Sequence, residues 1–143
     1  MYKKIIVPLD NSPTDETILT HIRQLARLTG ACLILVHVSD GFVARLQDQF
    51  NLVDSEEIKD DQAYLDRVYS GLHKEGFNVK AVLVQGKEPV EGILSVVQDE
   101  GGDLIAMATH GHQFLEDMIL GSVADTLRHR TGIPILMIRS SVK

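Results

Sequence analysis

Two short segments place polar residues and glycines directly after runs of β-branched residues. In the first, Val7-Pro8-Leu9-Asp10-Asn11-Ser12, an acidic side chain follows an apolar run. A carboxylate at such a point can bind a metal ion, a ribose or a phosphate-bound water. The competing interpretation is structural, because Asp and Asn are common turn residues and Ser12 is a good helix N-cap. Taken alone, this segment favours the structural interpretation.

The second segment runs from Met107-Ala108-Thr109-His110-Gly111 through a loop to Leu120-Gly121-Ser122-Val123. Gly111 has no Cβ, which allows a positive φ and the close approach of a ligand. Gly121 and Ser122 are predicted at the start of a helix. Unpaired backbone N–H groups, the helix dipole and the Ser122 hydroxyl would attract an anion there. The same residues also fit a plain turn followed by an N-cap, so this segment is a weak signal by itself.

The elements that must position these segments alternate between short apolar runs and longer amphipathic stretches. Runs rich in Ile and Val predict buried strands over residues 4–9, 32–38, 79–84, 104–108 and 135–138. Apolar residues at helical spacing predict helices over residues 13–29, 55–75, 89–99 and 122–130. Residues 39–54 favour neither a loop nor a short helix.

Helix-length connections between strands require parallel pairing and a sheet that is covered on both faces. We therefore predict a doubly wound, Rossmann-like α/β fold with a five-stranded parallel sheet flanked by about four helices. Such folds bind ligands at the carboxyl ends of the strands, where the strand order reverses. Both polar segments follow a predicted strand, so they are expected at this edge.

Composition narrows the class of protein further. The chain has 143 residues, 44% of them hydrophobic and 24% charged, which fits a single globular domain over residues 1–143. A net charge of −6 without any basic run argues against nucleic-acid binding. No stretch approaches a membrane span or a secretory leader, and the single cysteine excludes an internal disulfide. We expect a cytoplasmic protein.

Taken together, the segments resemble the nucleotide-binding signature of the universal stress protein family, G-x2-G-x9-G-[ST]. Gly111, nine intervening residues and Gly121-Ser122 match the second and third glycines of the signature and its hydroxyl. The opening segment resembles the family's V-P-x-D-x-S. Residues 130–138 resemble its closing helix, proline and final strand. The resemblance covers essentially the whole chain and implies a fold like that of the adenine nucleotide alpha hydrolases.

The resemblance implies a site for ATP or another adenine nucleotide between the first and fourth strands. Adenine would lie near the first two strand ends, and the phosphates would lie along the glycine-containing segment. Asp10 would act through a ribose or through Mg²⁺ carried by the nucleotide. The implied nucleotide-binding residues are Pro8, Leu9, Asp10, Val38, Met107, Ala108, Gly111, His112, Gly121, Ser122 and Val123.

The resemblance also implies a homodimer and a role in the stress response. The last strand, residues 134–138 with Pro134 and Ile138 at its ends, is an apolar edge that pairing with a second copy would protect. Nucleotide binding would order the loop at residues 112–120 and alter the dimer surface or the surface for a protein partner. The sequence does not identify that partner.

Three positions depart from the family pattern. Ala108 replaces the first glycine of the signature, which costs about 1 kcal/mol if residue 108 needs a positive φ and almost nothing if it is extended. His112 and Phe114 stand where many relatives have a basic residue and a glycine. Neutral His112 attracts a triphosphate less than arginine does.

Two other functions stay open. One is a nucleotide-free, dimeric interaction protein with the same fold. The other is a slow, metal-dependent ATPase with a water activated near Asp10, which ranks last because no residue has the character of a tuned general base. His37, His110 and His112 lack zinc-ligand spacing, and the chain has neither a GxxxxGK[ST] loop nor a G-x-S-x-G elbow.

Overall fold

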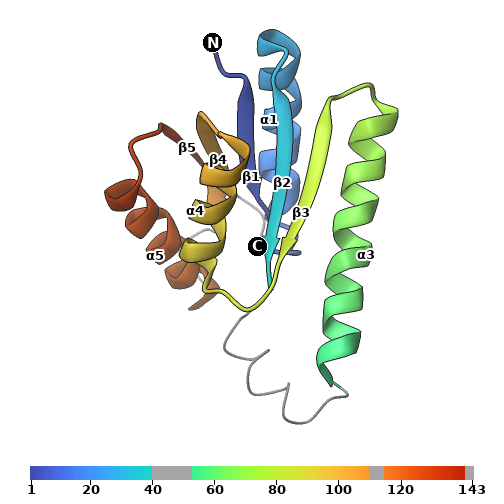
Figure 1. The fold of residues 1–143 in the computed structure, drawn as a ribbon, viewed down its shortest axis with the longest axis vertical. Coiled ribbons are helices and arrows are strands. Elements are labelled where there is room, and N and C mark those ends of the chain that lie inside the picture. Colours follow the sequence, from blue (N-terminus) through green and yellow to red (C-terminus); the bar gives the residue numbers. More distant parts are fainter. Residues whose placement is uncertain (40–52, 110–114, 141–143) are drawn as a thin grey trace.

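The computed structural model describes the backbone of residues 1–39, 53–109 and 115–140, and side chains for residues 1–39, 59–109 and 123–140. Strands and helices alternate along the chain, and the helices lie on both sides of a central sheet (Figure 1). The elements in chain order are β1 (Lys4–Pro8), α1 (Asp15–Thr29), β2 (Cys32–Val38), α3 (Val53–Lys74), β3 (Val79–Val84), α4 (Pro89–Glu100), β4 (Leu104–Thr109), α5 (Leu115–Arg130) and β5 (Ile135–Arg139).

The sheet has five strands in the order β3-β2-β1-β4-β5, and every neighbouring pair is parallel. This arrangement confirms the predicted doubly wound α/β fold, with four helices in the described part of the chain. The chain moves outward from β1 to β2 and β3, and then returns to the other side of β1 as β4. The strand order therefore reverses between β1 and β4, which is where folds of this type bind ligands.

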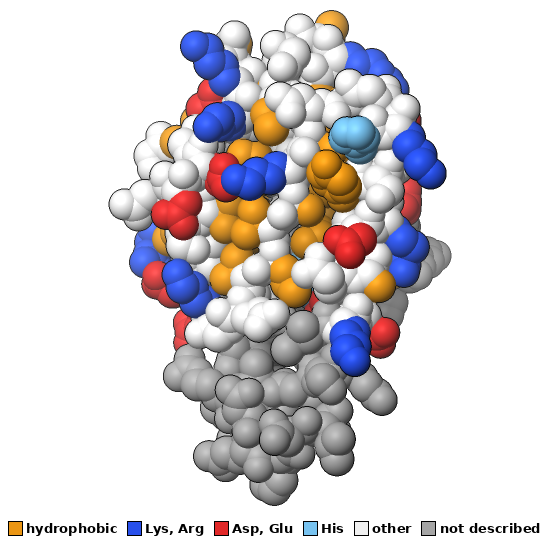
Figure 2. Space-filling model, turned by 45° about the vertical axis from the view of Figure 1, so that its right-hand side comes forward, with side chains coloured by type: hydrophobic (Ala, Val, Ile, Leu, Met, Phe, Trp, Pro, Cys, Tyr) orange, Lys and Arg blue, Asp and Glu red, His pale blue; other side chains and the backbone are white. Residues whose placement is uncertain are grey.

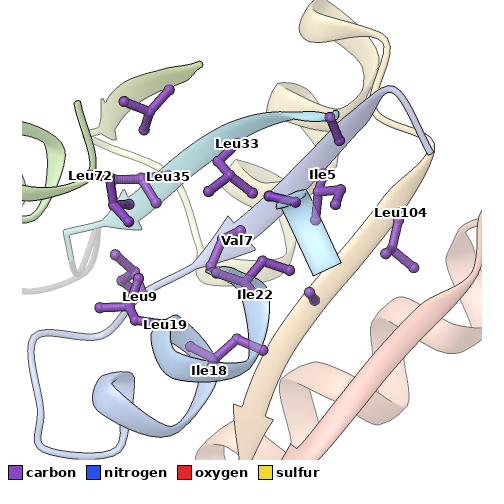
Figure 3. Packing of buried hydrophobic residues seen from close by; sticks show 14 of the residues in the cluster. Ile5, Val7, Leu9, Ile18, Leu19, Ile22, Leu33, Leu35, Leu72 and Leu104 are labelled. Carbon is purple, nitrogen blue, oxygen red and sulfur yellow. The ribbon is translucent and has the colours of Figure 1, made fainter. Parts of the chain in front are cut away.

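Two apolar layers hold the helices on the sheet, because successive strand residues point to opposite faces. On one face, Ile5 and Val7 of β1 pack with Ile18 and Ile22 of α1 (Figure 3), and Leu65 and Leu72 of α3 join the same cluster. The other layer joins β1, β2 and β4 to α4 and α5. Its largest buried members are Ile6, Ile34, Ile105, Met107, Ile93 and Leu127. None of the described helices has the length and apolar character needed to cross a membrane.

Both outer strands of the sheet present apolar side chains. In β3, residues 81–84 are only half-buried. Figure 2, turned so that the α3 side of the molecule comes forward, shows a band of exposed hydrophobic side chains flanked by charged ones. On the opposite edge, the Met137 side chain of β5 is 50% exposed. Apolar sheet edges of this kind favour pairing with another chain.

The predicted start of the last helix is wrong. The sequence pattern predicts a helix that begins at Ser122, whereas α5 begins at Leu115. Most of residues 115–120 are good helix formers, and one internal glycine costs a helix only about 1 kcal/mol. Gly121 is therefore accommodated inside α5, and it does not mark the helix boundary. The first helix also begins later than predicted, at Asp15 with Thr14 as its N-cap.

Gly92 lets α4 lie directly against the ends of β2 and β3. A Cβ at residue 92 would lie 2.7 Å from Cγ2 of Val38 and 3.2 Å from Cγ1 of Val84.

We expect Gly92→Ala to lower the free energy of unfolding by about 1–3 kcal/mol through overpacking. Gly71→Ala in α3 is the matched control, because a Cβ there meets nothing within 4 Å. It should raise stability by roughly 0.5–1 kcal/mol. Urea unfolding of both variants tests this, and equal effects would contradict it.

Candidate functional site

The carboxyl ends of β1, β2 and β4 meet at one edge of the sheet. Val38 ends β2 and Thr109 ends β4. After β1, the backbone N–H of Leu9 donates to the carbonyl of Val36 (2.8 Å), which continues the pairing of β1 with β2 by one residue. Asp10 therefore lies at the carboxyl end of β1. The structure thus brings together the predicted residues of the first, second and fourth strands.

The side chains of several predicted site residues are buried in the hydrophobic core. Leu9 and Ala108 are buried in the layer that contains α1, whereas Met107 and Val123 are buried in the layer that contains α4 and α5. These residues can therefore offer a ligand mainly their backbone groups. Among the predicted residues whose side chains are described, Pro8, Asp10 and Val38 are half-buried, so part of each side chain is accessible.

Ala108 lies within β4, in extended backbone. Among the described residues, Asn11 is the one non-glycine residue with a positive φ (62°). The departure from glycine at position 108 therefore carries no backbone strain. Its methyl group is accommodated by the apolar layer on the α1 side of the sheet.

The start of α5 does not coincide with the anion site that was expected at Gly121 and Ser122. Gly121 and Ser122 lie inside α5, where a backbone N–H bonds to the carbonyl four residues earlier. They are not the unpaired donors that a helix beginning at Ser122 would have supplied. Gly111, His112 and Phe114 lie outside the described residues, so their predicted roles remain predictions.

The loop after β1 is held in one conformation by a buried carboxylate. The backbone N–H groups of Asp10 and Asn11 donate to Oδ1 and Oδ2 of Asp15, at 3.1 and 2.9 Å. The hydroxyl of Ser12 donates to Oδ1 of Asp10 (2.5 Å), and the N–H of Thr14 donates to the Ser12 hydroxyl (3.3 Å). Asp10 is thus oriented by contacts within its own loop.

A second set of polar contacts joins this loop to β2 and α3. Nδ1 of His37 lies 2.8 Å from the carbonyl oxygen of Leu9, and Nε2 lies 3.0 Å from Oδ2 of Asp61. The side-chain amide of Asn11 donates to Oδ1 of Asp61 (3.2 Å). The Tyr64 hydroxyl donates to Oδ2 of Asp15.

Burial controls the electrostatics of this region. The side chain of Asp15 is only 5% exposed. Burial, reinforced by the negative charge of Asp10, raises the pKa of Asp15 to about 7, although the hydrogen bond from Tyr64 opposes this shift. The pKa of Tyr64 is also raised, first by burial and then by its bond to Asp15 and the charge there.

Sequence reasoning missed the contacts made by His37, Asp61 and Tyr64. The sequence indicates only that His37 lacks zinc-ligand spacing, and it predicts no contact for Asp15. The sequence held one signal of the His37 contact, because a histidine inside the apolar run of residues 32–38 needs a buried partner.

Among the described residues, no group of three or more His, Cys, Asp or Glu is placed to hold a metal ion.

Comparison with known proteins identifies relatives along the whole chain. Residues 1–139 match the universal stress protein family. Universal stress protein MJ0577 of Methanocaldococcus jannaschii is 31% identical over 156 residues, which cover 97% of this chain and 96% of that protein. Universal stress protein YxiE of Bacillus subtilis is 24% identical, with 97% of this chain and all of that protein covered.

Solved structures give the same result. A structure of MJ0577 has a TM-score of 0.86 at 31% identity and covers 100% of this chain and 99% of that one. The universal stress protein from Archaeoglobus fulgidus in complex with dAMP has a TM-score of 0.70 at 25% identity, with coverage of 96% and 98%. Sequence, element order and sheet topology therefore agree, and this chain belongs to the universal stress protein family.

Proposed function

We propose that this chain binds an adenine nucleotide, with ATP as the expected ligand, at the carboxyl ends of β1, β2 and β4, and that binding regulates a stress-response function. The observation that carries the proposal is the dAMP complex of the Archaeoglobus fulgidus relative, which is similar to this chain over 96% of its length. The reversal of strand order between β1 and β4 supports the same location.

The residues at this edge suit such a ligand. Pro8 at the end of β1 and Val38 at the end of β2 are half-buried apolar residues, which suits an adenine ring. Asp10 is positioned to accept a hydrogen bond from a ribose hydroxyl or from water on a cation. Mg²⁺ would neutralise phosphate charge near a chain whose net charge is −6, and it would take its remaining ligands from phosphate and water.

Calorimetric titration of ATP with Mg²⁺ into nucleotide-stripped protein tests the proposal. We expect micromolar binding by the wild type. Asp10→Ala should weaken it by roughly 10- to 100-fold, the usual effect of losing a hydrogen bond to a charged group. Asp99→Ala is the matched control. Asp99 is exposed near the end of α4, on the side of the sheet where the strands begin. Absence of binding by the wild type would favour the nucleotide-free interaction protein.

The regulatory part of the proposal requires a surface that joins two copies. We propose a homodimer through residues 134–138, supported by the edge position of β5 and the exposed Met137. Met137→Glu should raise the dimer dissociation constant by roughly tenfold or more, because like charges would then meet across a two-fold interface. Leu28→Glu, at an 86% exposed position on α1, should leave it unchanged. Sedimentation equilibrium distinguishes the two, and an unaltered dimer in Met137→Glu would contradict this interface.

A further inference from the structure

Helix α3 reaches the loop after β1 through two polar side chains. The helix is otherwise held on β2 and β3 by apolar residues such as Leu65 and Leu72. Asp61 and Tyr64 differ, because both bond to groups around Asp10 that lie about fifty residues earlier in the chain. The ring of Tyr64 also packs against the same apolar cluster.

The Asp61 link passes through His37. The carbonyl of Leu9 can only accept a hydrogen bond, so Nδ1 of His37 must carry a hydrogen. Nε2 then faces Oδ2 of Asp61 at a distance of 3.0 Å. The other oxygen of Asp61 accepts the amide of Asn11. Asp61 therefore connects β2 to the residue that directly follows Asp10.

The Tyr64 link passes through Asp15. The Tyr64 hydroxyl bonds to the same carboxylate that accepts the backbone N–H groups of Asp10 and Asn11. It thereby fixes the carboxylate that accepts hydrogen bonds from the backbone of the loop. A movement of α3 that displaced Tyr64 would release Asp15 and with it the backbone of Asp10.

The loop after β1 contains one residue with left-handed backbone. Asn11 has φ 62°, a region that asparagine adopts more readily than most other non-glycine residues. Four side chains from three elements hold it there: Asp15 from α1, His37 from β2, and Asp61 and Tyr64 from α3. The orientation of Asp10 is therefore a property of how α3 is docked.

We propose that Asp61 and Tyr64 are positioning residues through which α3 sets the conformation of the Asp10 loop, and that docking of α3 and nucleotide affinity are coupled. The second half of this inference rests on the proposed nucleotide site. The coupling is reciprocal, so nucleotide binding stabilises the docked helix by the same factor by which the docked helix strengthens binding.

A double-mutant cycle with Asp10 tests the coupling. Tyr64→Phe removes one hydroxyl and keeps the ring. It should weaken ATP binding by roughly five- to tenfold, the effect of one buried hydrogen bond. In the Asp10→Ala background, the same change should have almost no further effect, because it acts through Asp10. Tyr69→Phe is the control on the same helix, where the ring stacks on His73, and it should leave affinity unchanged. An equal loss in both backgrounds, or none in either, would overturn the proposal.

A ligand-free measurement separates this inference from the proposed function. The backbone amide resonances of Asp10 and Asn11 should move in Tyr64→Phe, because the Asp15 carboxylate that accepts them is displaced. They should also move in Asp61→Asn, because the contacts of residue 61 with the side chain of Asn11 and with His37 change. They should not move in Tyr69→Phe. If the wild type bound no nucleotide but these amides moved, the proposed function would fail and the positioning role would stand. Unmoved amides would overturn the positioning role, whatever the nucleotide affinity.

Discussion

The free energy of unfolding should fall by up to about 4 kcal/mol as the pH rises from about 4 to about 7, because Asp15 keeps its proton in the folded protein. Burial raises the pKa of this carboxyl from 3.8 to about 7 on folding. Between these values, the folded state binds a proton that the unfolded state has released. The resulting stabilisation is complete below the unfolded pKa and is lost as the pH rises through about 7.

Urea unfolding across this pH range, for the wild type and Asp15→Asn, isolates the effect. Asparagine keeps one acceptor oxygen and does not titrate. The difference in stability between the two proteins should therefore follow the Asp15 titration, with a slope of about 1.4 kcal/mol per pH unit. A flat difference between the two proteins would show that the pKa of Asp15 is the same in the folded and unfolded states.

Replacement of Asp61 by leucine should lower the free energy of unfolding by about 3 kcal/mol, the low end of the cost of breaking a buried ion pair. The side chains of His37 and Asp61 are 9% and 14% exposed, so the loss leaves Nε2 of His37 nearly buried without its partner. The amide of Asn11 loses its acceptor as well. These costs come from unpaired groups and not from lost attraction alone.

The double variant His37→Leu with Asp61→Leu distinguishes this explanation from a simple packing defect. Removal of both partners leaves neither of these two side chains without its partner, so the double variant should be less destabilised than the sum of the two single variants. Asp60→Leu, at the exposed neighbouring position, should change stability by no more than about 0.5 kcal/mol. Strictly additive losses in thermal or urea unfolding would count against the ion pair.

The sheet could be predicted from the sequence because each strand and helix is marked by the residue pattern within its own segment. Short Ile- and Val-rich runs separated by amphipathic stretches leave a parallel, doubly wound sheet as the simplest arrangement. The start of α5 was not predictable from the same signals. Gly121 is typical of a helix boundary, yet the helix-forming residues before it outweigh its modest cost.

The polar contacts around Asp10 were not predictable for a different reason. Asp15 bonds to Tyr64 across 49 residues, and His37 bonds to Asp61 across 24, so no spacing within one element reveals these pairs. The conformation of Ala108 was left open by the sequence and was decided by its place in β4. Local pattern thus specified the scaffold, whereas tertiary packing specified how the candidate site is held.

Amide NMR during titration with ATP and Mg²⁺ tests the central claim most directly, because it reports where the ligand binds. The claim predicts shifts at the carboxyl edge of the sheet, at Asp10, Val38 and Ala108. The helix-ending glycines Gly30, Gly76 and Gly101 precede β2, β3 and β4 at the opposite edge, and their amides should stay in place. Shifts confined to these glycines, or no shifts at saturating nucleotide, would contradict an adenine-nucleotide site at the strand ends.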